Sequence, residues 1–140
     1  IASDHRGVNL KKKLVEHFKN FKDYGTMTED SVDYPVYAFK IGEDVRDKML
    51  DFGILICGSG IGMSIACNKV KGVRCAKVNS AKEAEYTRND NDANVMAISA
   101  ELSDEDAIKI VETFLNTPFS KLVKHQRRIN LITKYEESNA

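Results

Sequence analysis

A glycine-rich segment directly after the chain's longest apolar run holds the residues best suited to chemistry. Residues 54–57 read Ile-Leu-Ile-Cys, and Gly58, Gly60 and Gly62 alternate with other residues behind them. Glycines let several backbone N–H groups converge on one point, and a helix starting there adds a partial positive charge. The pattern fits a phosphate-binding turn, an oxyanion hole or a plain tight turn. It is not the dinucleotide fingerprint, because only one residue separates the second and third glycines.

Cys57 ends the apolar run at the start of this turn. A thiol beside a helix N-terminus ionises more readily, which would make Cys57 a base or nucleophile near neutral pH. The alternative is a small core residue, which is the commoner role of a free cysteine. Cys67 and Cys75 fit that alternative, since one falls in a predicted helix and the other in a predicted strand. No resolving cysteine lies near Cys57 in sequence, which argues against a redox role.

Three further polar segments could bind a ligand. Asp4 and His5 follow a short first strand, where they could hold hydroxyls and an anion, although Asp4 could also simply cap a helix. Residues 124–128 read Lys-His-Gln-Arg-Arg. This local cluster suits a small dianion, or it is a solvated helix face. Residues 88–94 are a dense polar run of Asn and Asp that a structural turn would explain.

Composition excludes several classes of function. The 140 residues carry 21 Lys and Arg against 21 Asp and Glu, and this zero net charge argues against binding nucleic acid or an anionic membrane. No apolar run approaches the length of a membrane-spanning helix. Three cysteines without metal-type spacing fit a reduced, cytoplasmic protein. The length predicts one domain over residues 1–140.

Strand and helix patterns alternate along the chain, which indicates βαβ units and a three-layer α/β sandwich around a parallel sheet. In such folds the ligand lies beyond the carboxyl ends of the strands. A C-terminal helix from about residue 119 is expected to leave the body of the domain as an oligomer contact. The predicted strands are 1–2, 53–57, 73–78 and 95–98, and the predicted helices are 8–20, 34–50, 81–88 and one from 104.

Taken together, the segments resemble the type B ribose-5-phosphate isomerase family, which includes allose- and galactose-6-phosphate isomerases. The matching segments run in order over nearly the whole chain. They are Ser-Asp-His-x-Gly at 3–7, Asp-Tyr-Pro at 33–35, residues 54–66, Asn-Lys at 68–69, Asn-Asp-Ala-Asn-Val at 91–95 and His-Gln-Arg-Arg at 125–128.

The resemblance implies a Rossmann-like α/β/α fold, with a parallel sheet of about five strands and an extending C-terminal helix. It implies no metal or cofactor, and a homodimer or homotetramer whose active site is shared between subunits. The implied reaction interconverts ribose 5-phosphate and ribulose 5-phosphate through a cis-enediolate, in the pentose phosphate pathway. Such a reaction needs one base near two adjacent carbons and a group that holds the developing oxyanion.

The resemblance also implies the roles of individual residues. Cys57 matches the base that takes the C2 proton and returns it at C1, and Ser59 would help move the proton between oxygens. The enediolate oxygen would be stabilised by the backbone of Gly58, Gly60, Ile61 and Gly62. Asp4 would hold sugar hydroxyls, and Asn91 would lie near the reacting oxygens. The phosphate would be bound by His5, Lys124 and Arg128.

Three positions depart from the family pattern. Asp90 stands where the family has the His assigned to opening the furanose ring, so Asp90, a water or a neighbouring His would do that work. Glu101 replaces an Arg that binds phosphate from the partner subunit, and Lys124 replaces an Arg and loses its fork of donors. Two alternatives stay open. One is a 6-carbon aldose-phosphate isomerase, because pocket depth sets the chain length of the sugar and sequence does not measure it. The other is a weakly active sugar-phosphate-binding subunit, which Asp90 and Glu101 favour and Cys57 disfavours.

Overall fold

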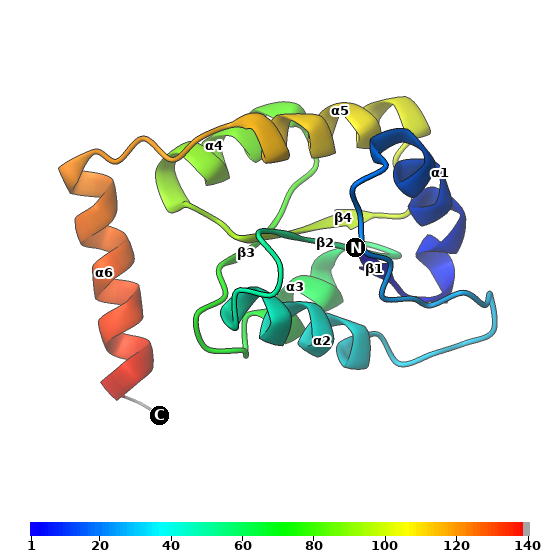
Figure 1. Cartoon of the computed structure of the whole chain (residues 1–140), viewed down its shortest axis with the longest axis horizontal. Helices are drawn as coiled ribbons and strands as arrows, with labels where there is room; N and C mark the ends of the chain where they lie inside the picture. The colour runs from blue at the N-terminus through cyan, green and yellow to red at the C-terminus, as the bar shows by residue number, and fades with distance from the viewer. Residues whose placement is uncertain (139–140) are drawn as a thin grey trace.

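The computed structural model describes residues 1–138 and contains a parallel four-stranded sheet in the order β1-β2-β4-β3. Helices cover both faces of this sheet, so the predicted three-layer sandwich is confirmed (Figure 1). The strands are β1 (Ala2–Ser3), β2 (Gly53–Cys57), β3 (Cys75–Lys77) and β4 (Val95–Ser99). The helices are η1 (His5–Gly7), α1 (Val8–Phe18), α2 (Tyr34–Arg46), α3 (Ile61–Cys67), α4 (Ala81–Asn91), α5 (Asp104–Asn116) and α6 (Val123–Ser138).

The described residues form four strands, where about five were expected. The segment Tyr24–Thr26 occupies the fifth position beside β1 without becoming a regular strand. It exchanges backbone hydrogen bonds with Ile1 and Ser3, at 2.8 to 2.9 Å. Gly25 has φ +97°, a left-handed conformation that interrupts extended backbone. The edge is therefore paired, but too irregularly to count as a strand.

Three of the predicted elements are shorter in the structure, and α4 is longer. α1 ends at Phe18 instead of at residue 20, whereas α4 continues to Asn91 instead of ending at residue 88. α2 ends at Arg46 instead of continuing to residue 50, because Lys48 adopts a left-handed conformation in the turn that follows. β3 covers only Cys75–Lys77 of the expected 73–78. Asp33 immediately precedes α2 and Pro35 lies in its first turn, but the Asp33 side chain makes no capping hydrogen bond.

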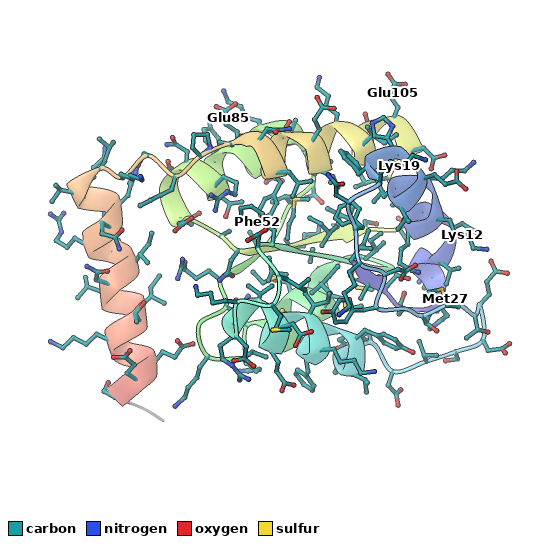
Figure 2. All side chains as sticks on the ribbon, in the orientation of Figure 1. Lys12, Lys19, Met27, Phe52, Glu85 and Glu105 are labelled. Carbon is teal, nitrogen blue, oxygen red and sulfur yellow. The ribbon has the colours of Figure 1, made fainter. Side chains whose placement is uncertain are left out.

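The apolar core consists of two layers, one on each side of the sheet. α1, α4 and α5 cover one face around Phe114, and α2 and α3 cover the other around Met63. Figure 2 shows Lys12, Glu85 and Glu105 on the outer sides of their helices, whereas Phe52 points inward. Its ring lies edge-on to Phe114, with the centroids 5.5 Å apart.

Helix α6 lies at the opposite end of the molecule from α1 (Figure 1), where it contacts the sandwich through the buried His125 and Ile129 and through a hydrogen bond from Gly72 N–H to Glu136 Oε2. This confirms the predicted C-terminal helix, although it begins at Val123, a few residues later than expected. Among residues 1–138, no helix is both long and apolar enough to cross a membrane.

Candidate active site

An open pocket of about 520 Å³ lies at the carboxyl ends of β1, β2 and β4. This is the edge where ligands bind in open parallel sheets. The structure also contains hollows elsewhere, but this one includes the glycine-rich turn and the end of β1. Its lining residues are Asp4, Arg6, Tyr34, Cys57, Gly58, Ser59, Ile61, Gly62 and Glu101.

Cys57 is the last residue of β2 and lines this pocket. Its backbone is fixed by the sheet, since its carbonyl accepts a hydrogen bond from Ala100 N–H at 2.9 Å. The residue is only 5% exposed and packs against the core layer of α2 and α3, yet it still lines the pocket. A ligand in the pocket can therefore meet a thiol held on a rigid strand.

The turn after Cys57 has a shape that only glycine allows at Gly60. Its φ is +80°, and a Cβ there would lie 3.0 Å from the backbone carbon of Ile98. Ser59 Oγ accepts a hydrogen bond from Ile61 N–H at 3.1 Å, which holds the hydroxyl against the turn. The pocket is lined by the other residues of the turn, Gly58, Ser59, Ile61 and Gly62. Gly60 is buried behind them and does not line the pocket.

The position of Asp4 is compatible with both roles considered from the sequence, a helix cap and a ligand-binding residue. Its Oδ1 accepts a hydrogen bond from Arg6 N–H at 3.0 Å, so it caps the short helix η1. It also lines the pocket, although its side chain is largely buried. His5 does not line the pocket, because its ring turns away and its Nδ1 accepts a hydrogen bond from Val32 N–H at 3.2 Å.

Two lining residues were not assigned a role from the sequence. Arg6 reaches the pocket from η1, and Tyr34 reaches it from the start of α2, with its hydroxyl beside Gly62. Glu101, recognised as a departure from the family pattern, also lines it. Arg6 and Tyr34 could have been identified from the sequence, because Arg6 lies within the Ser-Asp-His-x-Gly motif and Tyr34 within the Asp-Tyr-Pro motif. Both motifs lie beside the ends of elements that meet at the pocket.

Asp90 and Asn91 lie at the other edge of the sheet from Cys57 in the same chain. They end α4, which runs back from the carboxyl end of β3. The Asn91 carbonyl accepts a hydrogen bond at 3.0 Å from Arg74 Nε, and Arg74 immediately precedes β3. Asn94 Oδ1 likewise accepts from Arg74 N–H at 2.8 Å. The turn expected over residues 88–94 is only partly confirmed, because residues up to Asn91 belong to α4 and only residues 92–94 connect it to β4.

The basic cluster on α6 belongs to the same far edge as Asp90. His125 is buried, with Nε2 3.7 Å from Asp90 Oδ1 and Nδ1 2.7 Å from Ser120 Oγ. Lys124 and Arg128 flank it on the exposed surface of α6. Neither lines the Cys57 pocket of its own chain.

The other two cysteines have structural surroundings, as the sequence indicated. Cys67 is fully buried in α3, and a hydrogen bond with it, together with burial, raises the pKa of Cys75 above its ordinary value. Cys75 therefore remains a thiol at physiological pH. Cys57 differs from both because it borders the pocket.

Comparison with known proteins gives the same family throughout the chain. Residues 1–132 match the family model described as Ribose/Galactose Isomerase. A probable ribose-5-phosphate isomerase B of Mycoplasma genitalium is 45% identical over 146 residues, covering 98% of this chain and 94% of that protein. A putative sugar phosphate isomerase of Bacillus subtilis is 43% identical over 145 residues, covering 99% of this chain and 97% of that protein.

Solved structures show the same relationship in three dimensions. Ribose-5-phosphate isomerase B of Clostridium thermocellum has a TM-score of 0.95 at 37% identity, covering 99% of this chain and 97% of that one. The Mycoplasma genitalium enzyme, solved with bound ribulose-5-phosphate, has a TM-score of 0.92 at 43% identity, covering 97% and 93%. Sequence and fold therefore give the same answer: the chain belongs to the ribose/galactose isomerase family, whose members are aldose–ketose isomerases.

Proposed function

We propose that the protein interconverts ribose 5-phosphate and ribulose 5-phosphate, with Cys57 as the base. The observation that carries this proposal is the position of Cys57, on a rigid strand end facing a pocket whose wall is the Gly58–Gly62 turn. The names of the relatives, one of which binds ribulose-5-phosphate, support the choice of substrate. Family membership agrees with this reaction type.

In the proposed reaction, one proton moves between two adjacent carbons. The Cys57 thiolate takes the proton from C2 of the open-chain aldose, and the electron pair of that C–H bond forms the enediolate. The same sulfur returns the proton at C1, while a proton moves from the C2 oxygen to the C1 oxygen with help from Ser59. Backbone N–H groups of the Gly58–Gly62 turn stabilise the oxyanion, and Asp4 holds sugar hydroxyls.

A second copy of the chain completes the site in this proposal. Asp90, Asn91 and Arg128 lie at the far edge of the sheet from Cys57, so one copy cannot bring them to its own pocket. Helix α6 carries exposed apolar side chains, including Leu131 and Ile132, which suit an interface with another copy. We place Asp90 and Asn91 of one copy at the Cys57 pocket of the other, in a homodimer or homotetramer.

Asp90 is the proposed acid–base group for opening the furanose ring. A carboxyl side chain ordinarily has no proton to donate near neutral pH, whereas the imidazole found there in the family is partly protonated. We therefore expect ring opening to be slow in this protein.

The free thiols of Cys57, Cys67 and Cys75 suit a reducing compartment, and we assign the enzyme to the cytoplasm.

Assay of the purified protein with ribose 5-phosphate, ribulose 5-phosphate, allose 6-phosphate and galactose 6-phosphate tests the substrate. We expect kcat/KM to be highest for the pentose phosphates. Preference for a 6-carbon substrate would replace the proposal with the neighbouring activity. Binding of all four without turnover would favour a sugar-phosphate-binding subunit, which the two pocket carboxylates Asp4 and Glu101 make the second candidate.

Mixing two inactive variants tests whether the site is shared. Cys57→Ala and Arg128→Ala damage opposite halves of the proposed site, so a mixed dimer contains one intact site and one doubly damaged site. After unfolding and refolding together, the mixture should regain about a quarter of the wild-type activity. A mixture that stays as inactive as its components would show that both residues serve the same copy.

A further inference from the structure

Arg6 lies across the turn that follows the proposed base. It extends from η1, and a Cβ added at Gly58 would lie 2.9 Å from its Nη1 and 3.1 Å from its Cζ. The guanidinium therefore packs on the backbone of the residue next to Cys57, where only glycine leaves room for it. The Arg6 side chain is still 59% exposed and can reach a ligand in the pocket.

The pocket is lined by more negative than positive side chains, which disfavours binding of a negatively charged sugar phosphate. Among its described lining residues, Arg6 is the single cation, and Asp4 and Glu101 supply two carboxylates. His5, expected at the phosphate, is turned toward Val32. An incoming dianion thus meets one positive group on this chain, and that group is Arg6.

Glu101 forms a loose ion pair with Arg6. The distance from Arg6 Nη2 to Glu101 Oε1 is 3.8 Å, longer than a hydrogen bond, and the Glu101 side chain is 79% exposed. Such an exposed pair is weak and is readily exchanged for a better partner. A phosphate offers that partner, because its oxygens can accept two parallel hydrogen bonds from one guanidinium.

The backbone of Glu101 is fixed relative to the same turn. Glu101 N–H donates to Ser99 Oγ at 3.0 Å, and the Ser99 hydroxyl donates to the Gly58 carbonyl at 2.7 Å. Glu101 is thus tied at its backbone while its carboxylate remains solvent-exposed. It can hold the guanidinium over the turn and release it without any movement of the fold.

We propose that Arg6 is a substrate-binding residue that contacts the phosphate of the sugar, and that Glu101 weakens this contact by competing for the same guanidinium. The proposal rests on the proposed function, because it assigns the substrate's phosphate to the Cys57 pocket. Arg6 would thus supply a phosphate-binding cation in a chain where two arginines of the family pattern are replaced, by Glu101 and by Lys124.

Equilibrium binding to Cys57→Ala protein tests the proposal without turnover. Calorimetric titration with inorganic phosphate and with ribose 5-phosphate should show about 10- to 100-fold weaker binding when Arg6→Met is added, the loss expected for charged hydrogen bonds. Arg6→Lys keeps the charge and should bind between the two. Arg46→Met is the matched control, because Arg46 pairs with Asp47 outside the pocket, and it should bind phosphate unchanged.

A double-mutant cycle tests the role of Glu101. Glu101→Gln should tighten phosphate binding when Arg6 is present and change it less than about twofold in the Arg6→Met background. An equal effect in both backgrounds would mean that Glu101 repels phosphate directly and would overturn its proposed competition with Arg6. Unchanged binding in Arg6→Met would overturn the assignment of Arg6 itself.

Kinetics with Cys57 present locate the contact on the substrate. Loss of a phosphate contact should raise KM for ribose 5-phosphate far more than it lowers kcat. A lower kcat at unchanged KM would place Arg6 at the reacting oxygens and refute the phosphate assignment. If the wild-type protein does not isomerise ribose 5-phosphate, the proposed function fails, whereas the phosphate titrations still decide the role of Arg6.

Discussion

Replacing Gly60 by alanine tests whether the turn beside Cys57 depends on a backbone shape that only glycine provides. A left-handed conformation costs an L-residue about 1–2 kcal/mol. The added Cβ would also lie 3.0 and 3.1 Å from the carbonyl carbon and oxygen of Ile98, which are backbone atoms of β4 and cannot rotate away. Such overpacking costs about 1–3 kcal/mol, so Gly60→Ala should lower the free energy of unfolding by about 2–5 kcal/mol.

Gly72→Ala is the matched control for the steric part of this loss. Gly72 has φ +85°, close to that of Gly60, but a Cβ there would meet only the flexible side chain of Arg46 at 3.5 Å. The conformational cost alone predicts a loss of about 1–2 kcal/mol. Both substitutions remove the same backbone freedom from the unfolded chain, so their difference isolates the contact with β4.

Urea denaturation followed by circular dichroism measures both losses, provided that the two variants share the wild-type m-value. The Gly60 variant should be the less stable by about 1–3 kcal/mol. It should also lose isomerase activity, since its turn must shift to relieve the contact. Equal destabilisation of the two variants would refute the claim that Ile98 closes off the space behind this turn.

Two further predictions concern Asp90 and Tyr24. Asp90→His should raise kcat on ribose 5-phosphate, because imidazole is the better proton donor near neutral pH, and an unchanged or lower kcat would argue against slow ring opening. Burial, followed by a hydrogen bond to Asp44, raises the pKa of Tyr24 to about 12, above its ordinary value of 10.0. The neutral phenol of Tyr24 therefore makes its full contribution to the free energy of unfolding below pH 10, and this contribution is lost as the pH rises toward 12. Denaturation curves of Tyr24→Phe should lack this part of the alkaline decline, and identical pH profiles would contradict it.

The sequence was most informative where a local pattern determines local structure. The apolar run of β2 and the glycines behind it predicted the strand, the turn and the helix α3 in their observed order. Residues 80–83 read Ser-Ala-Lys-Glu, a helix-capping pattern, and Ser80 does cap α4, with its Oγ accepting a hydrogen bond from Glu83 N–H at 3.1 Å. The Glu83 carboxylate accepts a hydrogen bond from Asn79 N–H, one residue before the position that the capping pattern indicates.

Features that depend on distant parts of the chain could not be predicted from local pattern. Nothing near Arg6 in sequence indicates that its guanidinium rests on Gly58, since that contact exists only after β1 and β2 pair. The irregular edge segment Tyr24–Thr26 has no strand-like alternation, so its pairing with β1 is visible only in the structure. The separation of Asp90 from Cys57 follows from the direction of α4, and the shared site remains a prediction.

Solvent deuterium incorporation by Cys57→Ala protein shows whether Cys57 is the base that moves the proton between C2 and C1. Wild-type protein in D₂O should isomerise ribose 5-phosphate and place deuterium at C1 of ribulose 5-phosphate to the extent that the thiol exchanges with solvent. Cys57→Ala should slow both isomerisation and deuterium incorporation by about 10²- to 10⁴-fold, the usual contribution of a positioned base. Cys75→Ala, which changes a thiol outside the pocket, should keep the wild-type rate. Isomerisation by Cys57→Ala at the wild-type rate would show that Cys57 is not the base.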